Sequence, residues 1–212
     1  MYGCHNVTEK VKRQIAWKKE IKDKVWTRIV HEKITNQANV IKLTRPDLVE
    51  KLINYANSIT DGDRTNREAH AAKVYFNALF GSEFSRHRDS PINAALNYGY
   101  TILLSAINRE IVINGYLTQL GIFHDNAFNQ FNLSSDLIEP LRSLIDKEVV
   151  SWGFFEEFTS IQKMRLVDVL NCKVQIGDKR MQFVNALGTY CRSVLEALSE
   201  QKLDLIQCME YE

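Results

Sequence analysis

The chain has 212 residues and a formal net charge of +1, and 45% of its residues are hydrophobic, 10% aromatic and 25% charged. This composition is ordinary for a soluble globular protein with one sizeable core, and it argues against long disordered segments. The N-terminus lacks the apolar core of a signal peptide, and polar residues at 108–110 and 114 interrupt the most apolar run, so neither secretion nor a membrane span is expected. Four widely spaced cysteines disfavour a zinc site or a disulfide framework and indicate reduced thiols in the cytoplasm.

The small net charge hides an uneven distribution along the chain. Residues 1–45 hold eleven Lys and Arg against four Asp and Glu, whereas residues 110–212 hold nine bases against fifteen acids. A basic N-terminal part and an acidic C-terminal part suit a protein that binds a polyanion at one place and a cation at another. On charge alone, a solvated basic helix without a partner is the simpler explanation.

The first two elements are expected to be helices. Apolar residues spaced along 11–34 predict one long amphipathic helix with Lys and Arg on its outer face. The T-R-P-D motif at 44–47 predicts a second helix, with Thr44 as its N-cap and a proline in its first turn, that runs to about residue 59.

The rest of the chain is also expected to be mainly helical. After a polar loop, Asn66 is expected to cap a third helix that Gly81 ends. Pro91 opens a long buried helix that Gly121 ends, and Pro140 lies near the first turn of a later helix, where its missing N–H costs little; deeper in, it would kink that helix. The predicted helices after Gly81 span about residues 91–120, 135–150, 154–170 and 183–198.

A short β-hairpin is expected near residues 173–181, around Gly177 and Asp178. The predicted fold class is therefore mainly α, a compact multi-helix domain over residues 1–212 in which residues 151–212 form a C-terminal subregion.

The segment F-H-D-N-A-F-N-Q-F-N-L-S-S-D-L-I-E-P-L-R, residues 123–142, places His124 and several acids among apolar residues. Asp136 and Glu139 are three residues apart at a predicted helix start, so both carboxylates can lie on one face. The same spacing fits an N-cap Asp136 with Glu139 as its capping-box partner. From these residues alone, capping is the better explanation of the pair.

Glu68 is a further candidate, in the first turn of the Asn66 helix beside several alanines. Small neighbours let another element approach closely, and a glutamate there needs a partner or a cation, although a solvated first-turn acid is the common alternative. One His with two or three carboxylates suits Mg²⁺ or Mn²⁺ better than zinc. Such a site binds phosphate oxygens and activates a hydroxyl or water for in-line displacement.

Four ordered motifs resemble a known family, the CRISPR-associated integrase, which is the catalytic subunit of spacer acquisition, and the likeness is of the type II-A kind. The similarity extends from the first long helix to about Asp146. The motifs are N-R-E-A-H-A-A-K-V-Y-F-N-A-L-F-G (66–81), S-P-I-N-A-A-L-N-Y-G-Y-T-I-L-L (90–104), G-Y-L-T-Q-L-G-I-F-H (115–124) and F-N-L-S-S-D-L-I-E-P-L-R-S-L-I-D (131–146).

The resemblance implies one Mg²⁺ or Mn²⁺ site formed by Glu68, His124 and Glu139, with Asp136 in a supporting role. Arg142 matches the family's arginine after E-P, although Ser143 stands where a proline is frequent. The predicted DNA-binding residues, of which Arg86 and Arg88 rest on charge alone, are Arg86, Arg88, Arg142 and Lys73.

The implied activity is antiviral: a metal-dependent integrase and endonuclease joins the 3′-hydroxyl of captured foreign DNA to the repeat boundary of the CRISPR array by transesterification. The implied partners are double-stranded DNA, a second copy of the chain and a small CRISPR adaptation subunit, without a membrane. The alternatives are a non-catalytic DNA-binding or assembly module, and a general metal-dependent nuclease that needs no DNA 3′-hydroxyl.

Family members usually begin with a β-rich domain that carries much of the dimer contact. The present chain is therefore expected to be the C-terminal helical lobe of such a protein, with residues 1–10, including M-Y-G-C-H, as the remnant of the linker from that domain.

Overall fold

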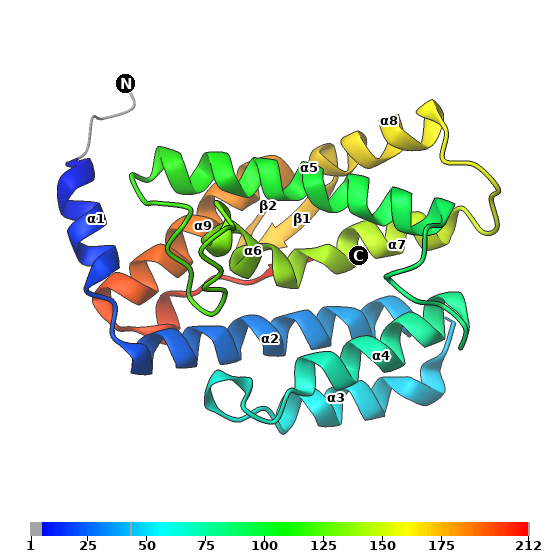
Figure 1. Cartoon of the computed structure of the whole chain (residues 1–212), viewed down its shortest axis with the longest axis horizontal. Coiled ribbons are helices and arrows are strands. Elements are labelled where there is room, and N and C mark those ends of the chain that lie inside the picture. Colours follow the sequence, from blue (N-terminus) through cyan, green and yellow to red (C-terminus); the bar gives the residue numbers. More distant parts are fainter. Residues whose placement is uncertain (1–5, 43, 212) are drawn as a thin grey trace. The chain divides into compact units, whose positions relative to one another are not determined.

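The computed structural model describes residues 6–42 and 44–211, whose helices and strands are drawn in Figure 1. The chain divides into two compact units. Of the described residues, the first unit comprises 6–26, 104–138 and 171–211, and the second comprises 27–42, 44–103 and 139–170. Helices dominate both units, and a small antiparallel sheet belongs to the first, which confirms the predicted mainly α fold. The M-Y-G-C-H segment of the expected linker lies outside the described residues.

The predicted N-terminal helix is in fact two helices, α1 (Val7–Ile15) and α2 (Lys19–Ile41). The buried side chain of Gln14 lies at the end of α1 and forms long-range hydrogen bonds within the first unit. Its Nε2 donates to the carbonyl oxygens of Leu117 (2.8 Å) and Leu120 (3.0 Å), and its Oε1 accepts from the N–H of Leu117 (2.8 Å). Such tertiary contacts override the local spacing that favours a continuous helix.

In the second unit, two helices that lie side by side follow α2, namely α3 (Val49–Asn57) and α4 (Arg67–Phe80) (Figure 1). Thr44 is not an N-cap, because its hydroxyl donates back to the carbonyl of Ile41 (3.3 Å). Pro46 instead opens a 3₁₀ turn, and Gly81 ends the pair as predicted, with a φ of +92°. The elements are η1 (Pro46–Leu48), α3 (Val49–Asn57), η2 (Asp61–Asp63) and α4 (Arg67–Phe80).

The start of α4 is capped by a different residue from the predicted one. Asn66 occupies the N-cap position, but its side chain forms no capping hydrogen bond. Asp63 performs that role, because its two carboxylate oxygens accept from the N–H groups of Arg67 (2.8 Å) and Glu68 (2.9 Å). The first turn that carries Glu68 is therefore fixed by a buried acid of the preceding loop.

Helix α5 (Pro91–Ile113) begins at the predicted proline but ends earlier than predicted. The reversal lies at Gly115, which has a φ of +81°, and not at Gly121. The N–H of Tyr116 donates to the carbonyl of Ile111 (3.2 Å), as in a helix C-terminus closed by a left-handed glycine.

The helix predicted at 135–150 is interrupted at Pro140. It consists of α6 (Asn132–Ile138) in the first unit, and of the 3₁₀ turn η3 (Glu139–Leu141) and α7 (Arg142–Ser151) in the second. Because the helix starts at Asn132, the proline falls well inside it, where it removes a backbone hydrogen bond and breaks the helix.

The predicted β-hairpin is confirmed, with Val174 opposite Met181 and a turn through Gly177, whose φ is +54°. A third strand pairs with the other edge of β1, giving the order β2-β1-β3, and α9 packs on this sheet (Figure 1). The elements are α8 (Ser160–Asp168), η4 (Val169–Asn171), β1 (Lys173–Ile176), β2 (Lys179–Gln182), α9 (Phe183–Glu200), η5 (Leu203–Leu205) and β3 (Met209–Glu210).

The second unit has a tightly packed core in which Gly99 of α5 faces Ile145 of α7. A Cβ atom at Gly99 would lie 2.4 Å from Cγ2 of Ile145, so only glycine permits this approach.

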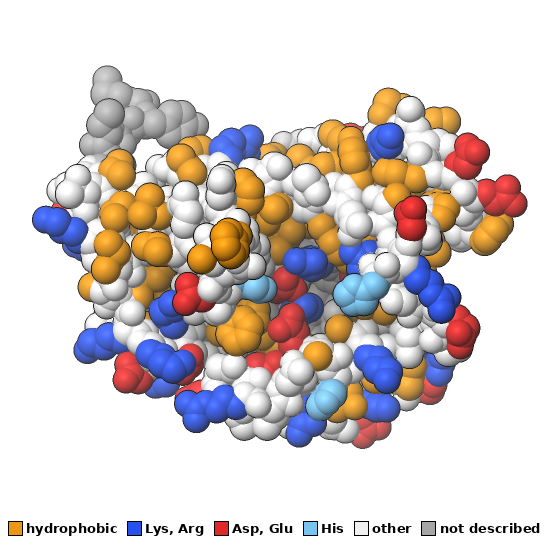
Figure 2. Space-filling view, viewed as in Figure 1, with side chains coloured by type: hydrophobic (Ala, Val, Ile, Leu, Met, Phe, Trp, Pro, Cys, Tyr) orange, Lys and Arg blue, Asp and Glu red, His pale blue; other side chains and the backbone are white. Residues whose placement is uncertain are grey.

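Hydrophobic side chains also remain exposed on α8, among them Ile161 and Met164 (Figure 2). Of the helices in the described ranges, none combines the length and the apolar character that crossing a bilayer demands.

Candidate metal centre and its supporting residues

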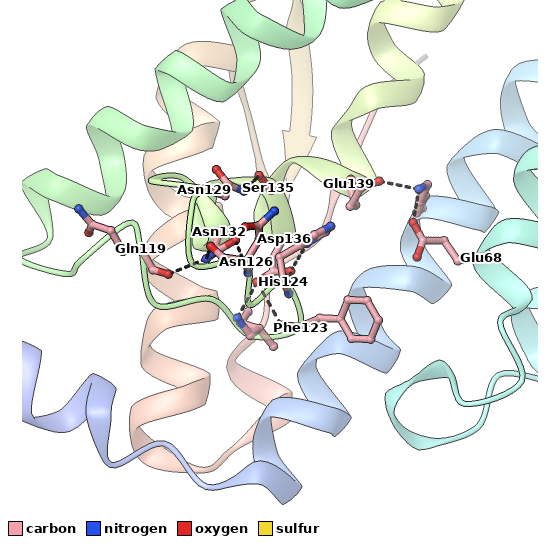
Figure 3. A network of polar contacts seen from close by, with 12 residues as sticks. Glu68, Gln119, Phe123, His124, Asn126, Asn129, Asn132, Ser135, Asp136 and Glu139 are labelled. Atoms are coloured by element: carbon pink, nitrogen blue, oxygen red, sulfur yellow. Dashed lines mark hydrogen bonds and ion pairs between the residues drawn. The ribbon is translucent and has the colours of Figure 1, made fainter. Parts of the chain in front are cut away.

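Two of the three predicted ligands, Glu68 and Glu139, share one cation in the second unit (Figure 3). The ammonium nitrogen Nζ of Lys33 lies 2.5 Å from Oε1 of Glu68 and 2.5 Å from Oε2 of Glu139. The other oxygen of Glu139, Oε1, lies 2.9 Å from a guanidinium nitrogen of Arg142. The side chains of Lys33 and Glu139 are only 11% and 5% exposed, so these ion pairs are shielded from solvent.

Helix α2 fixes the turn that carries Glu139. Asn36, three residues after Lys33 and therefore on the same face of α2, donates from Nδ2 to the carbonyl oxygen of Pro140 (2.9 Å). The helix thus contacts both the side chain of Glu139 and the backbone of the next residue.

The charges of this cluster stabilise one another. Burial by itself would lower the pKa of Lys33, but the negative charges of Glu139 and Glu68 outweigh it and raise the pKa above its ordinary value. Burial also favours a lower pKa for Arg142, but the negative charge of Glu139 opposes it, and the pKa of Arg142 is raised. Both cations therefore stay charged at neutral pH.

A buried carboxylate network lies beside Arg142. Asp146 accepts hydrogen bonds from the hydroxyl groups of Tyr75 (3.0 Å) and Tyr100. The guanidinium carbon of Arg142 lies 4.8 Å from the centre of the Tyr100 ring. Burial raises the pKa of Asp146 to about 6, although the two tyrosine hydrogen bonds and nearby arginines oppose the shift. Tyr100 thus lies between Asp146 and the arginine that binds Glu139.

His124 belongs to the first unit, where Asp136 holds it (Figure 3). Asp136 is fully buried inside α6, so the capping interpretation of this residue is wrong. Its Oδ2 accepts from the N–H groups of Ile122 (2.5 Å) and Phe123 (3.2 Å), and its Oδ1 accepts from the N–H of His124 (3.0 Å). Oδ1 also lies 2.7 Å from Nδ1 of the His124 ring. This bond orients the imidazole, as carboxylates do for many metal-binding histidines.

Packing fixes the same loop from two further sides. The ring of Phe123 stacks on Trp26 with a centroid separation of 4.4 Å, and the His124 ring meets Trp26 edge-on at 5.9 Å. Gly121 is also needed, because a Cβ atom there would lie 2.3 Å from the carbonyl oxygen of His124 and 2.8 Å from Oδ2 of Asp136.

The asparagines of the segment shape its loop. Asn126 and Asn129 each accept, through the side-chain oxygen, from the backbone N–H two residues further on, at 2.9 Å. Asn132 donates from Nδ2 to the carbonyls of Gln119 and Asn126, both at 3.0 Å (Figure 3). The contacts of Asn126 and Asn129 are the local turns that Asn side chains favour, whereas Asn132 links more distant parts of the loop.

The predicted DNA-binding residues divide into two kinds, all within the second unit. Arg86 donates to the side-chain oxygens of Asn93 and Asn97, and Arg142 pairs with Glu139. Arg88 and Lys73 are exposed. Figure 2 shows Lys and Arg side chains interspersed with acids over α3 and α4, so neither charge dominates there.

Sequence reasoning did not identify Lys33 or Asp146 as part of the site. The burial that sets Lys33 apart is visible only in the structure, where its helical neighbours at 29, 30, 36 and 37 are all buried. In the described ranges, no group of three or more His, Cys, Asp or Glu side chains is arranged to hold a metal ion.

Comparison with known proteins places the chain in a family. The family pattern described as CRISPR associated protein Cas1 matches residues 5–153. A CRISPR-associated endonuclease Cas1 from Neisseria meningitidis serogroup C (strain 8013) is 35% identical over 211 residues, which cover 97% of this chain and 69% of that relative.

Two solved structures share the fold. A casposase bound to integration product superposes with a TM-score of 0.76 at 18% identity, covering 92% of this chain and 70% of the casposase. A chain of a Cas6-RT-Cas1–Cas2 complex superposes with a TM-score of 0.79 at 18% identity, covering all of this chain and 28% of the other. With the family pattern and the meningococcal relative, the assignment is plain: the chain belongs to the CRISPR-associated Cas1 family.

Proposed function

We propose that this chain is the catalytic helical lobe of a DNA integrase and endonuclease of CRISPR adaptation. It would join the 3′-hydroxyl of captured foreign DNA to the repeat boundary of a CRISPR array by transesterification. The meningococcal relative, named an endonuclease, and the casposase, solved with an integration product, support this proposal. The observation that carries it is that Glu68 and Glu139, from separate elements, both contact the ammonium group of Lys33.

Glu68, His124 and Glu139 would hold Mg²⁺ or Mn²⁺. Two carboxylates and one imidazole suit these ions, and Nζ of Lys33, 2.5 Å from both carboxylates, supports their ability to converge on a positive charge. When bound, the ion supplies electrostatic stabilisation of the charge that develops on the attacking and leaving oxygens.

The chain's own side chains prepare this site. Asp136 holds Nδ1 of His124, so Nε2 would be the ligand atom, and the ring orientation is set before any ion binds. Arg142 binds Oε1 of Glu139, which directs Oε2 to the cation. Both arrangements reduce the reorganisation that ion binding requires.

Double-stranded DNA is the proposed substrate, bound through its phosphates in a salt-dependent manner. The exposed Arg88 and Lys73 suit this contact, whereas Arg86 and Arg142 already hold side chains of the protein. A second copy of the chain and a small adaptation subunit are the proposed partners, since one fold neighbour belongs to a Cas1–Cas2 complex. The proposed location is the cytoplasm.

A strand-transfer assay tests this function. The full chain, with its small partner subunit and Mn²⁺, is incubated with a short DNA duplex and a plasmid that carries the leader and repeat. Wild type is expected to join the duplex to the repeat, and His124→Ala and Glu139→Gln are each expected to lose at least about 100-fold in rate. Glu50→Gln, which changes an exposed carboxylate on α3, is the matched control and keeps full activity.

Two outcomes would favour the alternatives. DNA binding without metal-dependent strand transfer indicates a non-catalytic assembly module. Plasmid cleavage that persists when the duplex ends in 3′-deoxynucleotides indicates a general nuclease, because integration requires the 3′-hydroxyl.

A further inference from the structure

We propose that Lys33 is a positioning residue that holds Glu68 and Glu139 together in the metal-free protein and is displaced when the divalent ion binds. This inference rests on the proposed function, because it requires the two glutamates to be metal ligands. Lys33 would then act on the reaction only through those ligands.

The geometry places the ammonium where a metal ion would compete with it. Nζ lies 2.5 Å from an oxygen of each glutamate, which is close to the oxygen–cation distances of divalent metal sites. An ammonium has three N–H donors, so it can bind both carboxylates at once. The same two oxygens cannot surround Lys33 and a divalent ion at the same time.

The charge balance points in the same direction. Lys33 and Arg142 carry two positive charges, and Glu68 and Glu139 carry two negative charges, so the cluster is neutral without metal. A divalent ion added beside Lys33 would place two cations in contact in a poorly solvated site, which is strongly unfavourable. Departure of the ammonium removes that repulsion.

The helix allows such a displacement. Residues 29, 30, 36 and 37 around the base of Lys33 are buried, so its Cα position is fixed. The side chain itself has four flexible methylene groups and ends in a compact charge, and 11% of it is exposed. The ammonium can therefore move away while α2 stays in place. Arg142, the second cation, continues to bind Oε1 of Glu139.

Metal affinity is the direct test. The full chain is titrated with MnCl₂ by isothermal calorimetry, comparing wild type with Lys33→Met. Removal of the competing ammonium is expected to tighten Mn²⁺ binding about 5–150-fold, the usual range of coupling between two ligands. Lys24→Met, which removes an exposed lysine from the same helix, is expected to leave the affinity unchanged. A purely structural role of Lys33 predicts unchanged or weaker binding and would overturn the proposal.

Stability without metal provides the second measurement. In EDTA, Lys33→Met leaves the glutamates without their shared cation and is expected to lower the melting temperature. Saturating Mn²⁺ is then expected to raise that temperature more in the variant than in wild type, because ligand stabilisation grows with affinity. If Lys33→Met does not fold even with Mn²⁺, Lys33→Arg, which keeps the positive charge, is used instead. This variant is expected to bind Mn²⁺ no more tightly than wild type. Tighter binding would contradict the proposal.

The two proposals fail in different ways. Mn²⁺ binding that Glu139→Gln abolishes, combined with no tightening in Lys33→Met, overturns the role of Lys33 and leaves the metal site intact. Absence of Glu139-dependent Mn²⁺ binding in both wild type and Lys33→Met overturns the metal site and, with it, the role of Lys33.

Discussion

The His124 loop of the first unit and the glutamate cluster of the second hold their functional side chains in opposite ways. His124 is fixed by a buried carboxylate that accepts three backbone N–H groups and contacts the ring as well. Glu68 and Glu139 are fixed by the flexible ammonium of Lys33. The first arrangement is rigid and built from the backbone, whereas the second is an ionic bridge that another cation can replace.

For the proposed metal site, the difference suggests how its side chains stay in place without an ion. The imidazole of His124 needs orientation, which the hydrogen bond to Asp136 provides. Two adjacent carboxylates repel one another, so they need a positive charge to stay folded together. Each support therefore suits the side chain that it holds: Asp136 accepts a hydrogen bond at the imidazole, and Lys33 neutralises the carboxylates.

The largest expected effect comes from Asp136→Ala, which destroys the rigid arrangement. The variant leaves three backbone N–H groups of the loop without their acceptor, so a loss of about 3–5 kcal/mol in unfolding free energy is expected. Urea unfolding monitored by circular dichroism measures it. Asp125→Ala, at an exposed position of the same loop, should stay within about 0.5 kcal/mol of wild type. Equal losses in the two variants would refute the role of Asp136.

A pH effect of intermediate size tests the support behind Arg142. The folded-state pKa of Asp146 is about 6, against an ordinary value of 3.8 that the unfolded chain retains. The folded protein therefore binds this proton more tightly, so the stability contribution is complete below pH 4 and is lost as the pH rises through 6. The loss amounts to about 3 kcal/mol.

Comparison with Asp146→Asn isolates this contribution, because other acids titrate in both proteins. The unfolding free energy of wild type minus that of the variant should fall by about 2 kcal/mol between pH 4 and pH 7, which is most of the full effect. A difference that is constant across this range would show that Asp146 is not perturbed.

A smaller effect is expected from Gly121→Ala in the His124 loop. The added methyl group would press on the carbonyl of His124 and on Asp136, which costs about 1–3 kcal/mol. Thermal unfolding, together with the imidazole NMR signals of His124, measures the strain and its effect on the ring. Ala127→Ser also adds one heavy atom but at an exposed position of the segment, and it should change neither observable.

Local signals predicted much of the fold. Gly81, Pro91 and the Gly177 turn mark element boundaries correctly because each follows from the backbone freedom of a glycine or the fixed φ of a proline. The predictions failed where distant contacts decide. Gln14 ends α1 by bonding to a loop about a hundred residues away, and Pro140 interrupts a helix whose start was predicted three residues too late.

For the candidate site, the sequence supplied a hypothesis about three metal ligands but not the contacts that hold them. The family motifs indicated Glu68, His124 and Glu139, and the supporting role suggested for Asp136 agrees with its bond to His124. The three residues remain a predicted metal site. Lys33 and Asp146 could not be assigned from local spacing, because their partners come from elements far along the chain.

The three-residue spacing between Lys33 and Asn36 lets α2 contact the turn that carries Glu139 at two points. One side chain reaches Glu139 and the other reaches the carbonyl of Pro140, so both contacts depend on a single helical phase. An inserted or deleted residue between them would rotate one relative to the other by about 100° and break one of the two contacts. The turn that carries Glu139 therefore depends on the number of residues between positions 33 and 36, and not only on which residues stand there.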